Sequence, residues 1–263
     1  MQHHHAKKRL GQHFLKSTKA LHAMCNAAHL SQNDVVLEIG PGKGILTREL
    51  LQSGARVVAV EKDSDLLPIL TETFVEEIKN NQLTLIHGDV RSFDPNTHGL
   101  VEGEYKLVAN IPYYITGEII STFLEHVAAP STMILLVQKE VANRIVARDK
   151  KESVLSIAVK AFGTPRSVER VSRKYFSPPP KVDSAIIAIE NISQKNFASV
   201  SKKEFFSLLK LGFAQKRKKL AGNISSRISK EKFAAWCDAN SVSPDVRPEN
   251  LSVNHWFSLA QIL

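Results

Sequence analysis

The most constraining feature of this sequence is a regular alternation between short apolar runs and longer helical stretches. Five runs rich in β-branched residues have the length of buried strands, at 35–39, 57–60, 83–86, 106–109 and 133–137. Between them, residues 45–52 and 64–80 have helical periodicity. Because parallel strands need crossover connections and are buried on both faces, this order predicts a doubly wound α/β sheet with helices on both faces.

The pattern changes in the last third of the chain. Residues 167–171 and 182–190 predict two later strands, whose order suits an antiparallel pair, and bring the mostly parallel sheet to seven strands. A helical stripe of Phe and Leu then spans 205–213, and further helices are expected at 230–239 and 253–263. With the polar stretch 192–201 as linker, we expect a sheet domain over 1–192 and a small all-α domain over 201–263.

Bulk composition narrows the setting in which the protein works. Hydrophobic residues make up 43% of the 263 residues, enough for a sizeable core, but no apolar run is long enough to cross a bilayer. The basic N-terminal stretch lacks the apolar segment of a secretory signal. Cys25 and Cys237 are far apart and have no metal-ligand spacing. We therefore expect a cytoplasmic protein with reduced thiols, no metal and no membrane partner.

The distribution of positive charge points to a polyanionic partner. The formal net charge is +9, and the positive residues are bunched in three places. These clusters are Lys7-Lys8-Arg9, the group of Arg144, Arg148, Lys150 and Lys151, and Lys216-Arg217-Lys218-Lys219. Charge alone is also compatible with a generically basic protein, but three clusters on a chain of this length favour nucleic acid.

A glycine-rich turn follows the first predicted strand, in the run Glu38-Ile39-Gly40-Pro41-Gly42-Lys43-Gly44. Glycines allow a tight turn and close approach of a ligand to the backbone. Glu61 ends the second strand, where a carboxylate can accept both hydroxyls of a ribose, and Asp89 follows the third, where it can bind an adenine amine. A nicotinamide dinucleotide site is the alternative, but it requires a G-x-G-x-x-G spacing that this turn lacks.

The fourth predicted strand ends in Asn110-Ile111-Pro112-Tyr113. Pro112 has a fixed φ and keeps Ile111 extended, so the carbonyls of the turn can point outward. Asn110 offers an amide and Tyr113 a flat ring, which together suit a planar base with an exocyclic amine. Taken alone, the motif is equally consistent with a strand-to-loop turn that contains a buried tyrosine.

In their order and spacing these motifs resemble those of class I S-adenosylmethionine-dependent methyltransferases. More narrowly, the chain resembles the rRNA adenine N6,N6-dimethyltransferases, and among them those that act on small-subunit (16S) rRNA. The matching segments are 8–15, 38–44, 60–61, 88–89, 110–113, 138–141, 176–184 and 216–220. The resemblance implies a Rossmann-like methyltransferase domain with S-adenosyl-L-methionine as cofactor, followed by a helical rRNA-binding domain.

The resemblance also implies roles for particular residues. Residues 1–30 would cover the cofactor and contact RNA, with His13 at a position where many relatives have asparagine. The cofactor-binding set is Gln12, His13, Leu15, Gly40, Gly42, Glu61, Lys62, Asp89, Val90 and Asn110. The catalytic set is Asn110, Ile111, Pro112, Tyr113 and Phe176. Phe176 would grip the target base from the face opposite Tyr113, although a core phenylalanine beside the rigid run Pro178-Pro179-Pro180 is the alternative.

The implied reaction is transfer of methyl groups to the N6 amines of two adjacent adenosines in a hairpin loop near the 3' end of small-subunit rRNA. The partner would be this rRNA within an immature 30S particle, and the protein would act as a monomer. The implied RNA-binding residues are Lys7, Lys8, Arg9, Arg144, Arg148, Lys216, Arg217, Lys218 and Lys219. Two alternatives remain, namely a large-subunit rRNA dimethyltransferase of the macrolide-resistance type and a non-catalytic RNA-binding assembly factor on the same scaffold.

Overall fold

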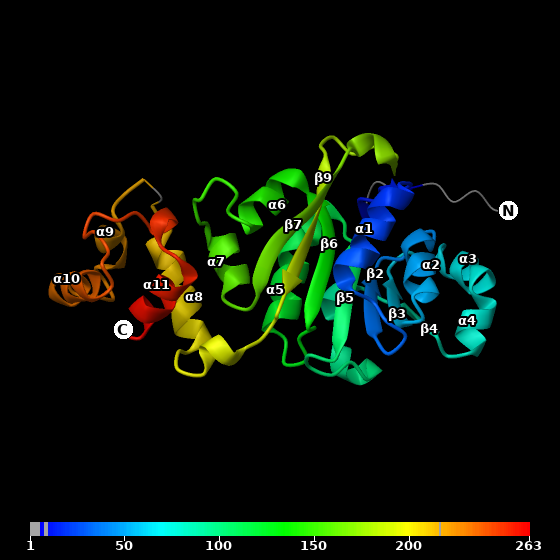
Figure 1. Cartoon of the computed structure of the whole chain (residues 1–263), viewed down its shortest axis with the longest axis horizontal. Coiled ribbons are helices and arrows are strands. Elements are labelled where there is room, and N and C mark those ends of the chain that lie inside the picture. Colours follow the sequence, from blue (N-terminus) through cyan, green and yellow to red (C-terminus); the bar gives the residue numbers. More distant parts are fainter. Residues whose placement is uncertain (1–5, 8–9, 216) are drawn as a thin grey trace. The chain divides into compact units, whose positions relative to one another are not determined.

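The computed structural model describes residues 6–7, 10–215 and 217–263, and Figure 1 shows the chain. The chain divides into two compact units, one made of residues 1–142 and 164–192 and the other of 143–163 and 193–263. Residues 143–163, placed in the sheet domain by the sequence analysis, thus group with the C-terminal helices. One reason is aromatic packing, because the ring of Phe162 lies 5.0 Å from that of Phe197.

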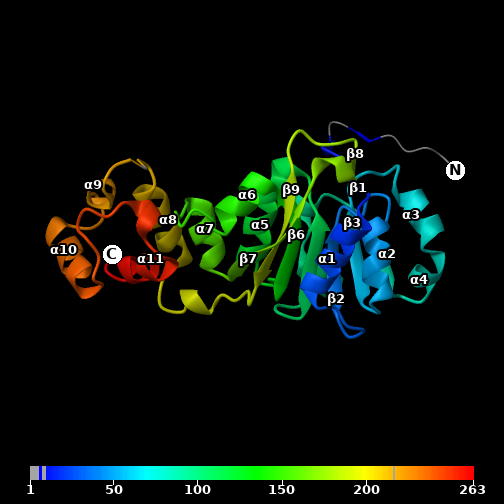
Figure 2. The same cartoon turned by 45° about the horizontal axis from the view of Figure 1, so that its top comes forward.

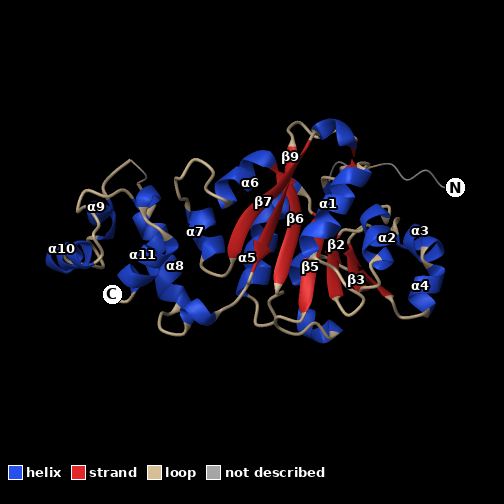
Figure 3. Ribbon diagram, in the orientation of Figure 1, coloured by secondary structure: helices blue, strands red, loops and turns tan. Residues whose placement is uncertain are grey.

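The first unit is built on a seven-stranded sheet of order β4-β3-β2-β5-β6-β9-β7 (Figure 3). Its strands are β2 (Val35–Ile39), β3 (Arg56–Glu61), β4 (Leu83–His87), β5 (Tyr105–Asn110), β6 (Thr132–Gln138), β7 (Thr164–Val171) and β9 (Ser184–Glu190). The strands from β4 to β6 are parallel, whereas β9 is antiparallel to both β6 and β7. The predicted mostly parallel sheet and its later antiparallel pair are confirmed.

The apolar composition of the strands follows from helices on both faces of the sheet. Helices α1 (Thr18–Ala28) and α2 (Ile45–Gln52) cover one face and α5 (Thr116–Glu125) the other (Figure 1). Leu37, Val108 and Leu135 in the central strands are fully buried. The chain leaves β2 toward β3 on one side and reaches β5 on the other, so the strand order reverses beside β2. In open α/β sheets, ligands bind at the carboxyl ends of the strands at such a reversal.

The single helix predicted over 64–80 is wrong in its continuity. Two helices, α3 (Leu67–Thr73) and α4 (Val75–Lys79), meet at Phe74, which has φ −119° and ψ 36°. Phe74 is fully buried, and a Cβ placed on Gly44 would lie 2.5 Å from its ring. The guanidinium of Arg48 in α2 lies 5.3 Å from the centroid of the same ring. The helix is therefore interrupted where Phe74 packs into the core, and helical periodicity in the sequence does not indicate this interruption.

A second, two-stranded sheet joins the N-terminal segment to the segment that follows β7. Strands β1 (Phe14–Leu15) and β8 (Phe176–Ser177) are antiparallel, with Leu15 opposite Phe176 (Figure 2). These strands are too short for a period-two pattern to predict them. The short 3₁₀ turns are η2 (Val90–Ser92), η3 (Pro95–His98), η4 (Tyr113–Ile115), η5 (Arg173–Tyr175), η6 (Lys195–Phe197) and η7 (Pro248–Asn250).

The second unit is helical and has an aromatic core. Its helices are α7 (Val154–Lys160), α8 (Lys202–Gly212), α9 (Leu220–Ile224), α10 (Lys230–Ala239) and α11 (Val253–Ala260), while α6 (Lys139–Ile145) crosses the division between the units. Phe205 of α8 stacks on Phe257 of α11 at 4.5 Å. The predicted small all-α C-terminal domain is confirmed. No helix within the described residues is long and apolar enough to cross a membrane.

Candidate active site

A cavity of about 1140 Å³, counted with its open mouth, lies at the carboxyl ends of β2, β3, β4 and β5. Its walls come from the glycine turn after β2, the ends of β3 and β4, the turn after β5, and residues 10–15 of the N-terminal segment. Every residue predicted to bind the cofactor lines this cavity, and so do Ile111, Pro112 and Tyr113 of the predicted catalytic set. The fold thus joins segments of the chain that extend from Leu10 to Ile115.

The glycine turn leaves room for a ligand against its backbone. Gly40, Gly42 and Gly44 have φ of +67°, +61° and +76°, in the left-handed region that favours glycine. A Cβ on Gly40 would meet no atom within 4 Å, so at this residue the backbone borders open space. A Cβ on Gly42 would lie 3.1 Å from the ring of Phe14, which covers the turn. The turn is therefore an open cradle with an aromatic cover.

Glu61, at the end of β3, is fixed by backbone donors. Its Oε2 accepts a hydrogen bond from the Gly42 N–H at 3.0 Å, and its Oε1 accepts one from the Asp63 N–H at 2.7 Å. The side chain is only 5% exposed, and burial raises its pKa above the ordinary glutamate value. A carboxylate has about four lone-pair sites, so Glu61 can still accept hydroxyl donors from a ligand.

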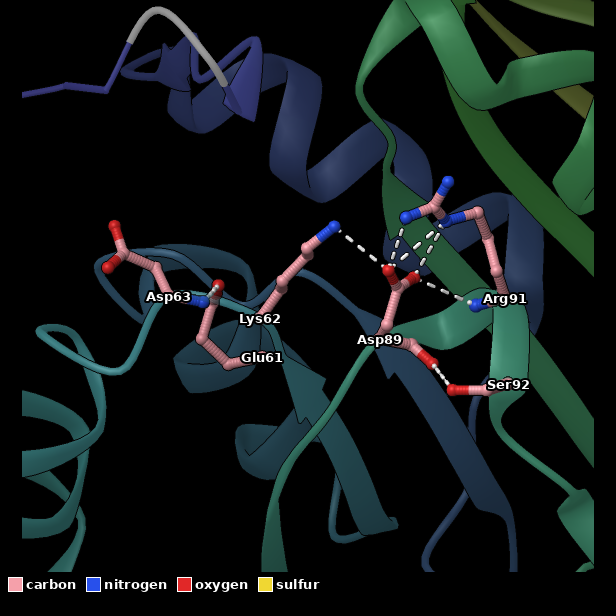
Figure 4. Close-up of polar contacts among 6 residues, drawn as sticks. All are labelled: Glu61, Lys62, Asp63, Asp89, Arg91 and Ser92. Atoms are coloured by element: carbon pink, nitrogen blue, oxygen red, sulfur yellow. Dashed lines mark hydrogen bonds and ion pairs between the residues drawn. The ribbon is translucent and has the colours of Figure 1, made fainter.

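Asp89, just after β4, is paired with two cations (Figure 4). Its Oδ2 lies 2.8 Å from Lys62 Nζ and 2.5 Å from an Arg91 terminal nitrogen, and Arg91 Nε donates to Oδ1 at 3.0 Å. The hydrogen bonds from Arg91 hold the pKa of Asp89 well below its usual range, despite partial burial. Asp89 is therefore ionised and oriented. Arg91 was not predicted, and its position two residues after Asp89 is the signal that could have indicated it.

Glu38 is a second residue that the predicted site omitted. It lines the cavity and is 1% exposed, and neither carboxylate oxygen makes a hydrogen bond of ordinary geometry among the described residues. Burial raises the pKa of Glu38 to about 8, although Thr47 opposes the rise. A buried carboxylate without a partner is costly, so a ligand with a cationic donor fits this position. The sequence signal was a charged residue inside the apolar run of β2.

The turn after β5 is held from two sides. Asn110 Nδ2 donates to the His13 carbonyl at 3.2 Å, which leaves Oδ1 as an acceptor. The Tyr113 hydroxyl lies 2.6 Å from Ser184 Oγ, and the His13 ring stacks on the Tyr113 ring at 6.0 Å. Burial raises the pKa of Tyr113, so its ring stays neutral. The Pro112 carbonyl accepts from the Ile115 N–H at 3.2 Å.

The N-terminal segment is tied to the cavity by polar contacts. Lys7 Nζ lies 2.5 Å from a carboxylate oxygen of Asp63 and 2.5 Å from one of Asp65. Gln12 Nε2 donates to Asp63 at 2.8 Å, and His13 Nδ1 lies 2.7 Å from the Pro178 carbonyl. Lys7, Gln12 and His13 therefore connect the end of β3 with the proline run that precedes β9.

Phe176 is the one member of the predicted catalytic set that does not line the cavity. Its side chain is 3% exposed and belongs to the hydrophobic core of the first unit. Its predicted contact with the target base stays a prediction, which would require the ring to leave this core.

The residues predicted to bind RNA are distributed over both units. Lys8, Arg9 and Lys216 lie outside the described residues. Lys7 is engaged with Asp63 and Asp65, as described above. Arg144, Arg148, Arg217 and Lys218 are exposed on the second unit, and exposed Lys219 pairs with Asp245 at 2.6 Å. In the described part of the chain, no group of three His, Cys, Asp or Glu side chains could hold a metal ion.

The sheet order and this cavity define a Rossmann-like methyltransferase. Solved structures with the same fold include a dimethyladenosine transferase from Plasmodium falciparum, with a TM-score of 0.78 and 29% identity over 94% of this chain and 96% of that one. The 23S rRNA methyltransferase ErmE has a TM-score of 0.76 and 25% identity, over 95% of this chain and 99% of that one.

The chain belongs to the ribosomal RNA adenine dimethylase family, whose model matches residues 3–263. It is 40% identical over 256 residues to the ribosomal RNA small subunit methyltransferase A of Dehalococcoides mccartyi, which covers 97% of this chain and 87% of that protein. It is 39% identical over 268 residues to the protein of the same name from Rippkaea orientalis, which covers 98% and 97%.

Proposed function

We propose that this protein transfers methyl groups from S-adenosyl-L-methionine to the N6 amines of two adjacent adenosines in small-subunit rRNA. The observation that carries the proposal is one cavity with two kinds of wall. One wall contains Glu38, Glu61 and Asp89, which suit a nucleoside that carries a cationic group. The other wall contains the Asn110–Tyr113 turn, which suits a planar base. The names of the relatives, small subunit methyltransferases A, support the choice of rRNA.

The cavity fits this cofactor group by group. Glu38 would pair with the ammonium group of the methionine part, because its buried carboxyl lines the cavity and no cation is paired with it in the described residues. Gly40 would let the methionine part lie against the backbone. Glu61 would accept hydrogen bonds from the ribose hydroxyls, and Asp89 would accept one from the adenine amine. When bound, S-adenosylmethionine supplies a methyl group already activated on a cationic sulfur.

The protein has to position a poor nucleophile. The N6 lone pair of adenine is delocalised into the ring, so donors and acceptors must turn the amine toward the methyl group. Asn110 Oδ1 is available because the amide nitrogen is committed to the His13 carbonyl. The Pro112 carbonyl already accepts from Ile115, so the Ile111 carbonyl is the better second acceptor. These dipoles stabilise the positive charge that develops on nitrogen.

Tyr113 would stack on the target base, which must leave its neighbours to enter the cavity. Its hydroxyl is held by Ser184, so the ring is fixed before the base arrives. After one transfer the amine keeps a single N–H. Separate acceptors on Asn110 and Ile111 can each serve that remaining hydrogen, which is compatible with a second transfer.

The second unit would supply most of the electrostatic attraction for rRNA. Arg144, Arg148, Arg217, Lys218 and Lys219 are exposed there, and exposed cations release counterions when they meet phosphates. On the same reasoning we propose an immature 30S particle as substrate and a monomer as the active species. Large-subunit rRNA is the alternative, because the fold also matches ErmE, although at lower identity than the small-subunit relatives.

The decisive experiment supplies labelled S-adenosylmethionine and unmethylated 30S particles, and then maps the modified nucleosides. We expect dimethyladenosine at two adjacent positions of small-subunit rRNA. A parallel reaction contains protein-free large-subunit RNA. Label found only in that RNA would move the function to the large subunit, and no label in either, with the cofactor bound, would indicate a non-catalytic protein.

A further inference from the structure

Two neighbouring tyrosines at the cavity have opposite environments. Tyr113 is half-buried, with its hydroxyl on Ser184, whereas Tyr114 is 59% exposed although it also lines the cavity. Both lie in the 3₁₀ turn η4, where successive side chains point about 120° apart. Tyr114 is thus a large ring exposed beside the predicted position of the target base, and the proposed function gives it no role.

The ring of Tyr114 packs against the backbone of the N-terminal segment at Gly11. Gly11 has φ +62°, and a Cβ placed on it would lie 3.1 Å from Tyr114 Cε1 and 3.7 Å from Pro112 Cβ. The absence of a side chain at Gly11 therefore lets the backbone approach this aromatic ring closely. A ring that packs against the Gly11 backbone and is 59% exposed presents a flat surface at the cavity.

The surroundings of this ring favour a nucleotide over an apolar partner. Arg91 lines the same cavity and is 43% exposed. Its guanidinium donates hydrogen bonds to Asp89, which raise the pKa of Arg91, so this side chain stays positively charged. An exposed aromatic ring and a cation that line the same cavity are groups with which proteins bind single-stranded nucleic acid.

We propose that Tyr114 binds the nucleotide next to the target adenosine, whose base stacks on its exposed ring. The inference rests on the proposed function. A target base that leaves the helical stack deprives its neighbour of a stacking partner, and unstacking costs a few kcal/mol. Tyr114 replaces that partner at the cavity mouth while Tyr113 receives the target base inside.

The first test compares Tyr114→Phe with Tyr114→Leu, using unmethylated 30S particles as substrate. We expect Phe to keep the wild-type KM for particles, because only the ring is needed, and Leu to raise it about tenfold, in line with the loss of one base–aromatic stack. The KM for S-adenosylmethionine should stay unchanged in both variants. Equal KM values for Phe and Leu, or an effect confined to the cofactor KM, would overturn the proposal.

Tyr175→Leu is the matched control. Tyr175 is 42% exposed in the same unit but does not line the cavity. We expect it to change the particle KM less than Tyr114→Leu does. Equal effects would mean that any exposed aromatic ring on this unit contributes in the same way, and the specific role of Tyr114 would be lost.

Ultraviolet crosslinking of the wild-type protein to 30S particles identifies the occupant directly. We expect the peptide with Tyr114 to carry the nucleotide adjacent to the methylated adenosine. A crosslink from this peptide to the methylated adenosine itself would contradict the assignment. So would the absence of any crosslink from this peptide when other peptides of the protein are crosslinked. The wild-type reaction tests the proposed function separately. If the proposed function is wrong, neither the wild type nor any variant will methylate the particles.

Discussion

The cavity of the first unit and the basic surface of the second use charge in different ways. In the cavity, Glu38, Glu61 and Asp89 are buried or fixed by partners at defined distances. On the second unit, Arg217, Lys218 and Lys219 are exposed, and the ion pair between Lys219 and Asp245 is also exposed. The difference teaches that the cavity acts through geometry, whereas the surface acts through the sum of its charges.

The largest effect should follow from Asn110→Ala, which removes the free acceptor of the catalytic turn. We expect kcat to fall about 100- to 1000-fold, as when one preorganised polar group is removed from a transition-state site. Binding of 30S particles should remain within about twofold, since base-independent contacts are untouched. Methylation rates and particle-binding titrations measure the two quantities. Asn96→Ala, in the exposed turn η3, is the control, and near-normal turnover of Asn110→Ala would remove the assigned role.

Glu61→Gln should act on the cofactor rather than on the chemistry. The amide keeps the shape but loses the charge that strengthens hydrogen bonds from Gly42, Asp63 and a ribose. We expect the affinity for S-adenosylmethionine, measured by calorimetry, to fall about 10- to 100-fold. Turnover at saturating cofactor should stay close to that of the wild type. Glu102→Gln, an exposed change, should leave both unchanged, and an unaltered affinity in Glu61→Gln would exclude a ribose contact.

Glu38→Gln should change how stability depends on pH. Burial raises the pKa of Glu38 to about 8, whereas a glutamate in an unfolded chain titrates near 4.3. The stability that this group contributes is therefore fully present below about pH 4 and is lost as pH rises to about 8. We expect Glu38→Gln to remove a loss of about 1–3 kcal/mol between pH 5 and 8. Denaturant unfolding at both pH values measures it, and an unchanged pH profile would contradict the assignment.

The smallest effect per residue should come from the basic surface. Replacing Arg217, Lys218 and Lys219 together by neutral residues should weaken particle binding and reduce its dependence on salt. The slope of the logarithm of the binding constant against the logarithm of the salt concentration should become less steep by up to about 0.7–0.9 for each phosphate contact that is lost. Each single change should have about a third of the combined effect, because no geometry links the three. Binding titrations at several salt concentrations test this. An unchanged slope would leave the cluster as a solvated surface without a phosphate partner.

The sequence predicted what depends on periodicity and on strand ends. The strands 35–39 and 57–60 were found because their residues are buried on both faces, and 83–86 because of its apolar run. The residues at their ends converge since parallel strands share one edge. It did not predict that 143–163 group with the C-terminal helices, and it left the burial of Phe176 as the alternative to a contact with the target base. Both depend on packing between segments distant in the chain. The same holds for the roles of Arg91 and Tyr114.

The contact between Phe74 and Gly44 has a consequence for how substitutions combine. Gly44 precedes helix α2, which borders the glycine turn, and Phe74 lies between α3 and α4. The ring of Phe74 fills the space that a side chain at Gly44 would need. A smaller side chain at position 74 would leave a void beside the glycine turn, which we propose binds the donor nucleoside. A substitution at Phe74, which does not line the cavity, should therefore change the affinity for the ligand. The effects of substitutions at Phe74 and Gly44 should be non-additive.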